Sequence, residues 1–74
     1  MTGKKYRYKN TVLFVREYKA VNSMAWGPFF VDRQGRDRAY TTAGLTLGHM
    51  SEAEAQAELD AFAAAHELKA VRQK

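Results

Sequence analysis

The chain of 74 residues has no cysteine, a single proline and no long apolar run. Without cysteine it can form no disulfide, thiolate zinc site, iron–sulfur cluster or cysteine nucleophile. Its longest apolar runs, residues 12–15 and 61–65, are much shorter than the roughly 20 residues that cross a bilayer. The N-terminus also lacks the apolar segment of a secretory signal. We therefore expect a cytoplasmic protein that makes no contact with a membrane.

The composition is that of a folded protein, with 46% hydrophobic and 27% charged residues. Starting at Met1, residues 1–74 read as one small domain. A chain this short buries roughly 60% of its unfolded surface, so the free energy of unfolding is expected to be small. Homodimerisation is one way in which such a domain gains stability.

The net charge of +4 is unevenly distributed along the chain. Up to Met50, nine Lys or Arg oppose three Asp or Glu, whereas from Ser51 onward three oppose five. The first part of the chain is therefore basic and the second acidic, which points to an acidic partner for the first part.

The segment Thr11–Lys19 is rich in β-branched and aromatic residues and is predicted to be a strand. Alternation places Val12, Phe14, Arg16 and Tyr18 on one face, and Leu13, Val15, Glu17 and Lys19 on the other. Residues 6–9 either extend this strand or form a short strand before a kink near Asn10.

Residues 20–27 contain Asn22, Ser23 and Gly27 and precede Pro28, so they are predicted to be an extended or turning connection. Asp32 and Gly35 then occupy the first and fourth positions of a type I turn closed by a left-handed glycine. Residues 29–33 and 36–42 are accordingly predicted to form a β-hairpin, after which residues 43–49 form a loop that leaves the sheet.

Ser51 followed by Glu54 is typical of a capping box at the start of a helix. We expect this helix to run from about Glu52 to His66 and to end near Glu67. Its sheet-facing side comprises Ala55, Leu59, Phe62, Ala63 and His66. Residues 68–72 are either coil or a short added strand.

These elements predict an α+β fold of β-β-β-α order. The sheet is antiparallel with three or four strands, and the one C-terminal helix packs across one of its faces.

The sequence offers few groups for catalysis. His49 is predicted to be an exposed loop residue, and His66 a cation near the negative end of the helix or a partly buried side chain. Ser51 has no neighbouring base to activate it, and residues 44–48 lack the lysine of a phosphate-binding loop. The acidic residues of the helix are spread over its solvent side. We therefore expect no catalytic residue, no metal site and no cofactor.

The remaining signal is the mixture of cations and tyrosines, which suits phosphate neutralisation and contact with bases. The candidate nucleic-acid contacts are Lys4, Lys5, Arg7, Lys9, Arg16, Tyr18, Arg33, Arg36, Arg38 and Tyr40. Residues 4–9 would form an N-terminal arm. Alternation puts Arg36, Arg38 and Tyr40 on one face, and whether Arg16 and Tyr18 share that face depends on the strand register. The alternative is that these cations only solvate the surface and protect an edge strand from aggregation.

Residues 27–40 and 51–62 resemble the AP2-like, arm-binding N-terminal domains of phage and transposon integrases. Asp32, Gly35 and Arg36 match the hairpin of that family, and Ser51, Glu54 and Ala55 match its helix entry. The resemblance implies three strands and a helix, with the sheet rather than the helix facing DNA. Arg16, Tyr18, Arg33, Arg36, Arg38 and Tyr40 would then be the residues at the DNA surface.

A second hypothesis is a protein-interaction module of phage or mobile-element type. Trp26, Phe29 or Phe30 would anchor the partner, because a tryptophan beside methionine and phenylalanine near a turn suits such a contact. The competing interpretation of Trp26 is a residue of the hydrophobic core.

Overall fold

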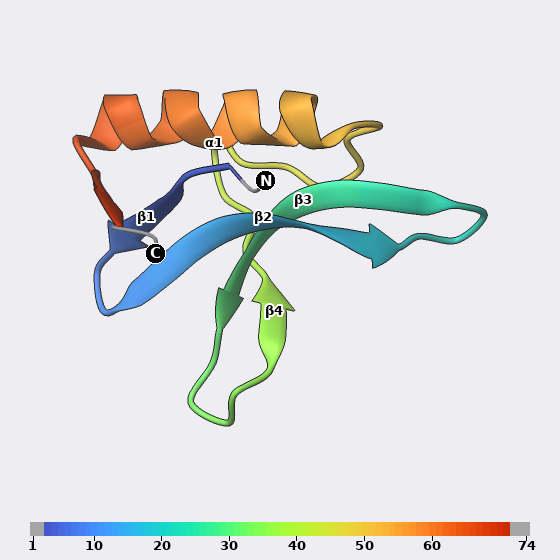
Figure 1. The fold of residues 1–74 in the computed structure, drawn as a ribbon, viewed down its shortest axis with the longest axis horizontal. Helices are drawn as coiled ribbons and strands as arrows, with labels where there is room; N and C mark the ends of the chain where they lie inside the picture. Colours follow the sequence, from blue (N-terminus) through green and yellow to red (C-terminus); the bar gives the residue numbers. More distant parts are fainter. Residues whose placement is uncertain (1–2, 72–74) are drawn as a thin grey trace.

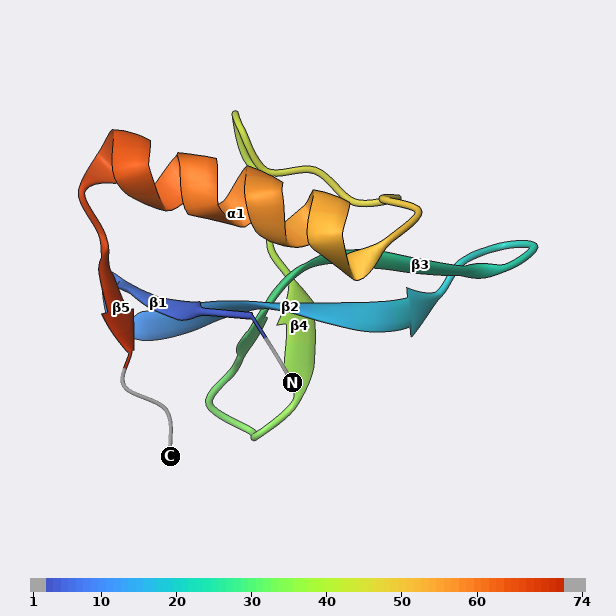
Figure 2. The same ribbon diagram turned by 45° about the horizontal axis from the view of Figure 1, so that its top comes forward.

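The computed structural model describes residues 3–71, which form one helix and one antiparallel sheet (Figure 1). The elements are β1 (Lys5–Tyr8), β2 (Thr11–Lys19), β3 (Met24–Val31), β4 (Asp37–Ala39), α1 (Glu52–His66) and β5 (Lys69–Val71). The strand order is β4-β3-β2-β1-β5, and α1 packs against β2 and β3 (Figure 2). The predicted α+β fold is confirmed.

The sheet has five strands rather than three or four. One additional strand comes from residues 5–8, which form β1 instead of extending β2. The other is β5, which pairs with β1 after the helix and so resolves the choice between coil and strand for residues 69–71. Arg72 lies outside the described residues.

Strand β1 is an inner strand of the sheet, paired with β2 on one side and β5 on the other. A turn at Lys9 and Asn10 joins β1 to β2, and Lys9 has a positive φ of 56°. The predictions of a free N-terminal arm or a solvated edge strand are therefore wrong for residues 5–8. Backbone hydrogen bonding to two neighbours holds this segment in the sheet.

Strand β3 begins at Met24, earlier than predicted, so that the connection between β2 and β3 comprises only residues 20–23. Pro28 had indicated a break, yet the strand runs through it. The Tyr40 N–H donates to the Pro28 carbonyl at 3.0 Å where β4 ends, and the next pairing along this edge joins Trp26 to His49. Pro28 therefore lies where the pairing between β3 and β4 ends, and its missing N–H leaves this last pair with one hydrogen bond instead of two.

The turn between β3 and β4 forms as predicted. The Gly35 N–H donates to the Asp32 carbonyl at 3.0 Å, and Gly35 has a left-handed φ of 81°. The Asp32 carboxylate accepts from the backbone N–H groups of Gln34 and Arg36 and from Arg38 Nε. The Arg38 hydrogen bond is the main reason that the pKa of Asp32 is lowered.

Helix α1 has the predicted boundaries, Glu52–His66. The Glu54 N–H donates to Ser51 Oγ at 3.2 Å, which satisfies a backbone group that the helix itself leaves unpaired. Its buried residues are Ala55, Leu59, Phe62 and Ala63. His66 is exposed rather than buried, and its ring packs on Phe62 with centroids 4.2 Å apart.

The core between sheet and helix contains a residue that was predicted to lie in a loop. Leu45 is 1% exposed and joins Tyr6, Leu13, Leu59 and Phe62 in a single cluster. A tight turn pairs Thr42 with Leu45, with Gly44 at a φ of 92°. The segment predicted to be a loop leaving the sheet therefore turns a leucine into the core.

Candidate nucleic-acid interface

The sheet has one face covered by α1 and one face that no helix or strand of residues 3–71 covers (Figure 2), although Leu47 of the loop before α1 lies over Gly27 on that face. The strand register assigns each side chain to a face, because paired residues project to the same side. Tyr6, Leu13 and Phe30 belong to the helix side, where they contribute to the core. The opposite side, called the open face below, presents Lys5, Arg7, Val12, Phe14, Arg16, Tyr18, Ala25, Gly27, Phe29, Val31, Asp37, Ala39, Lys69 and Val71.

Cations and aromatic rings contact one another along the open face. Lys5 Nζ lies 5.4 Å from the centre of the Phe14 ring. The Arg16 guanidinium lies 5.3 Å from the centre of the Phe29 ring, and the Tyr18 ring lies 5.7 Å from the same ring. Cation–π contacts of this kind hold the charged groups above the rings, and the charged groups stay accessible to solvent. β2 and β3 thus carry a row of aromatic side chains flanked by cations.

The edge formed by β1 and β5 places like charges opposite each other. Arg7 pairs with Lys69 in the register, so both side chains project from neighbouring positions of the open face. Like charges directly opposite in a sheet are destabilising unless an anion compensates them. Asp37 is the only acidic residue on this face within residues 3–71, and it bonds to Arg16 Nη1 at 3.1 Å. The open face is therefore strongly basic.

A shallow depression of about 580 Å³ lies on the same face. Val12, Phe14 and Val31 supply its apolar surface, and Lys5 and Asp37 supply a cation and an anion. Asn10 and Thr11, from the turn between β1 and β2 and the start of β2, complete the lining. This volume is within the range of roughly 300–1,000 Å³ that is usual for small-molecule sites.

The ten predicted contact residues do not share one face. Lys5, Arg7, Arg16 and Tyr18 lie on the open face, whereas Arg38 and Tyr40 project to the helix side. The register thus answers the question that alternation left open, and it separates Arg16 and Tyr18 from Arg38 and Tyr40.

The helix-side residues have structural partners. Arg38 Nε donates to Asp32 Oδ2 at 2.7 Å. The Tyr40 ring packs on Tyr8 and Phe30, with centroids 6.0 and 6.1 Å apart. Burial first, and then a hydrogen bond with Tyr8, raises the pKa of the Tyr40 hydroxyl. Tyr40 therefore extends the core instead of presenting its ring to a ligand.

The other predicted cations lie at turns or outside the strands. Arg33 and Arg36 are exposed in the turn between β3 and β4. Lys9 is exposed in the turn between β1 and β2, with its Nζ 5.3 Å from the centre of the Tyr8 ring. Lys4 precedes β1, and its carbonyl accepts from Gln56 Nε2 of the helix at 3.1 Å.

Four charged or aromatic residues of the open face were missing from the predicted site: Phe14, Phe29, Asp37 and Lys69. Alternation along β2 already grouped Phe14 with Arg16 and Tyr18, so that residue could have been included. Phe29, Asp37 and Lys69 could not, because their places depend on pairing between strands that are distant in the sequence.

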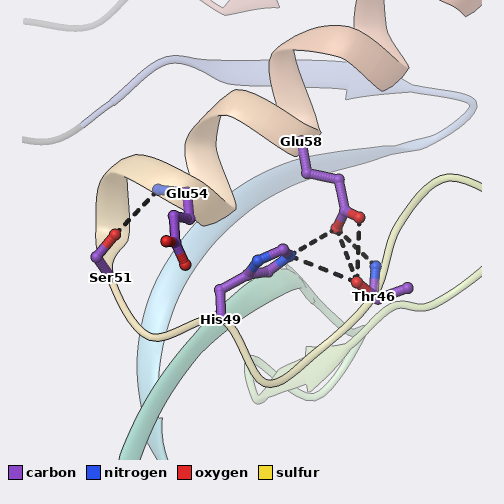
Figure 3. A network of polar contacts seen from close by, with 5 residues as sticks. All are labelled: Thr46, His49, Ser51, Glu54 and Glu58. Carbon is purple, nitrogen blue, oxygen red and sulfur yellow. Dashed lines mark hydrogen bonds and ion pairs between the residues drawn. The ribbon is translucent and has the colours of Figure 1, made fainter.

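His49 is half-buried and paired, not an exposed loop residue. Its Nε2 lies 2.9 Å from Glu58 Oε1, while the Thr46 N–H and hydroxyl also donate to the Glu58 carboxylate (Figure 3). Burial by itself raises the pKa of Glu58, but these hydrogen bonds outweigh it and leave the pKa lowered. The network joins the loop to α1, so a structural role accounts for both residues.

Trp26 is half-buried in β3, and its backbone exchanges two hydrogen bonds with His49, at 2.9 and 3.1 Å. It belongs neither to the buried core cluster nor to the exposed large hydrophobic residues. The structure therefore matches neither of the two extreme interpretations of this tryptophan.

Within residues 3–71 no three His, Asp or Glu side chains come together in a way that could hold a metal ion. The helix in this part of the chain is too short and too polar to cross a membrane. No protein-family model, curated protein sequence or solved structure matches the chain.

Proposed function

We propose that this chain is a non-enzymatic domain that binds DNA through the open face of its sheet. The observation that supports this most is the arrangement of Lys5 and Arg16 over Phe14 and Phe29 on the face of the sheet opposite α1. Phe29 is buried, at 7% exposed, and Phe14 is half-buried, so Phe14 is the ring that a base could reach. Proteins use cations beside accessible aromatic rings to bind phosphates and bases.

Four cations would contact phosphates: Lys5, Arg7, Arg16 and Lys69. The opposed pair Arg7 and Lys69 lacks an acidic partner among the described residues, so a phosphate would relieve its repulsion. Arg33, Arg36, Lys4 and Lys9 stand outside this face and would add contacts only at its margins. As in the integrase domains, the sheet would face DNA, but Lys5, Arg7 and Lys69 would lie at the DNA surface in place of Arg38 and Tyr40.

Two matched variants test the choice of face. Arg16→Ala and Arg38→Ala each remove an exposed strand arginine that is paired with an aspartate, but the two arginines project to opposite sides. Fluorescence anisotropy with labelled mixed-sequence DNA, measured over a series of salt concentrations, gives the affinity and its salt slope. We expect Arg16→Ala to weaken binding and to reduce the slope by about one, with Arg38→Ala close to wild type. Equal effects of the two variants, or no effect of either, would contradict the proposal.

A protein partner is the second candidate function, and exposed apolar residues near the connection between β2 and β3 favour it. Val21 is 94% exposed, Met24 48% and Met50 77%. Apolar side chains exposed to this degree are common at contact surfaces of proteins. If a protein binds there, Val21→Ser with Met24→Ser would abolish its binding and leave DNA affinity unchanged.

A further inference from the structure

The depression on the open face combines a surface for stacking with groups that can read a base. Half-buried Phe14 lines it together with Val12 and Val31. Lys5 at one side carries the positive charge that a phosphate requires, and Asp37 provides acceptor oxygens. The aromatic ring, the cation and the carboxylate match three features of a nucleotide: the face of its base, its phosphate and the hydrogen-bonding edge of the base.

The use of an aromatic ring restricts the form of DNA that the depression can take. In a duplex the faces of the bases stack on one another and their pairing edges are occupied, so neither is accessible to Phe14 or Asp37. In a single strand both are accessible, and an aromatic side chain can stack on the base. Lys5 Nζ now lies over the Phe14 ring, and its flexible side chain can move to a phosphate when a base takes that position.

The Asp37 carboxylate sets which base edge can hydrogen-bond in the depression. Within residues 3–71 the Asp37 carboxylate bonds only to Arg16, through Oδ2, and Arg16 thereby holds it on the open face. An ionised carboxylate only accepts hydrogen bonds, so it favours a base edge with adjacent N–H donors. Guanine presents N1–H and the N2 amino group side by side, whereas no pairing edge of adenine, cytosine or thymine carries N–H donors on two adjacent positions.

We infer that the depression binds one unpaired base of a single strand, with a preference for guanine, by stacking on Phe14 and hydrogen bonding to Asp37. This inference rests on the proposed function and specifies its ligand. The excess of cations on the open face supports a nucleic-acid strand as the occupant, since the strand would neutralise Lys5, Arg7 and Lys69 along the same surface.

The test uses labelled oligothymidines with one central dG, dI, dA or dC, together with the duplex of each. We expect single strands to bind more tightly than duplexes, and the dG strand to exceed the all-thymidine strand by at least about fivefold. Inosine lacks the N2 amino group, so the dI strand should lie between them. Asp37→Asn should abolish the guanine preference, while Asp32→Asn, the same change in the other Asp–Arg pair, should preserve it.

Phe14 is tested by a pair of variants that controls for folding. Phe14→Ala should weaken binding of every single strand by at least about fivefold, and Phe14→Trp, which keeps an aromatic face, should restore it. Circular dichroism melting would verify that each variant folds.

The outcomes separate the two proposals. Guanine preference that is lost in Asp37→Asn would establish the base site. Duplex and single strands binding equally, or a guanine preference that survives in Asp37→Asn, would overturn the base site but leave DNA binding intact. If wild-type protein binds neither form at low salt, the proposed function fails, and this inference fails with it.

Discussion

The Tyr6 hydroxyl donates a 2.7 Å hydrogen bond to Asp60 Oδ1, joining β1 to α1 across 54 positions of the chain. Tyr6 is 8% exposed and belongs to the core cluster. Asp60 also accepts from Gln56 Nε2 at 2.9 Å, and the same amide donates to the Lys4 carbonyl. This short network fixes the helix over the N-terminal strand, whose other side presents Lys5 and Arg7.

Removing the Tyr6 hydroxyl should destabilise the fold. Hydrogen bonds to charged groups contribute more than neutral ones, and since Asp60 is exposed we expect Tyr6→Phe to lower the free energy of unfolding by about 1–2 kcal/mol. Urea denaturation followed by circular dichroism measures the change. Tyr18→Phe is the control, because that hydroxyl makes no hydrogen bond among the described residues, and it should cost less than about 0.5 kcal/mol. Equal losses would contradict the role of Asp60.

Alkaline titration should separate Tyr6 from the other tyrosines. Burial, with the hydrogen bond and negative charge of Asp60 adding to it, raises the pKa of Tyr6 from 10.0 to about 12. In the unfolded chain the hydroxyl loses its proton at lower pH than in the folded chain. The stabilising contribution is therefore complete below pH 10 and is lost as the pH rises toward about 12. Ultraviolet absorbance of phenolate, measured against pH in wild type and Tyr6→Phe, would follow the ionisation of the Tyr6 hydroxyl. The tyrosine that titrates late in wild type should be absent from the variant.

Leu45 and Leu47 provide a matched comparison in one loop. Leu45 is 1% exposed and Leu47 39% exposed. Leu45→Ala leaves a cavity among core residues and should cost about 2–5 kcal/mol, enough to unfold a domain of this size to a large extent. Leu47→Ala should cost less than about 1 kcal/mol. Thermal melting of the two variants measures the difference, and similar melting temperatures would show that Leu45 is not a core residue.

Lys9 adopts a left-handed backbone conformation, with a φ of 56° in the turn between β1 and β2. A lysine pays a steric cost there that glycine does not. We expect Lys9→Gly to raise the free energy of unfolding by up to about 1 kcal/mol, and Lys9→Val to lower it. The denaturation midpoints of the two variants should move in opposite directions from wild type. A lower midpoint for Lys9→Gly would show that the left-handed backbone at Lys9 is not strained.

The Glu58 network should make the fold sensitive to acid. The pKa of Glu58 lies below its usual 4.5 because hydrogen bonds from Thr46 and His49 outweigh the opposing effect of burial. A group with a depressed pKa stabilises the fold above its unfolded pKa, and the contribution disappears as the pH falls below about 4.5 through the folded value.

Glu58→Gln should therefore reduce stability at neutral pH and flatten the dependence of stability on pH in this acid range. Glu54→Gln is the control, because the Glu54 side chain lies on the same helix outside the network of Thr46 and His49 (Figure 3). Urea denaturation at several pH values between 3 and 7 would reveal the difference. A wild-type acid dependence in Glu58→Gln would exclude this carboxylate as its source.

Local signals in the sequence were sufficient for several elements. Ser51 and Glu54 located the start of α1, and Asp32 with Gly35 located the turn before β4, because capping and turn geometry depend on residues only a few positions apart. Alternation within Thr11–Lys19 likewise separated the two faces of β2 correctly, since a strand's side chains alternate whatever its partners are.

The candidate site depended on contacts that are distant in the sequence. Lys69 reaches the open face only because β5 pairs with β1, and Asp37 reaches Arg16 only through the register of β3. The same pairing turned Arg38 and Tyr40 to the helix side and made residues 5–8 an inner strand. Composition and local pattern thus determined the fold class, the helix and the basic character of the first 50 residues. Strand order and register decided which charges share a surface, because a shift of one residue moves every side chain to the other face.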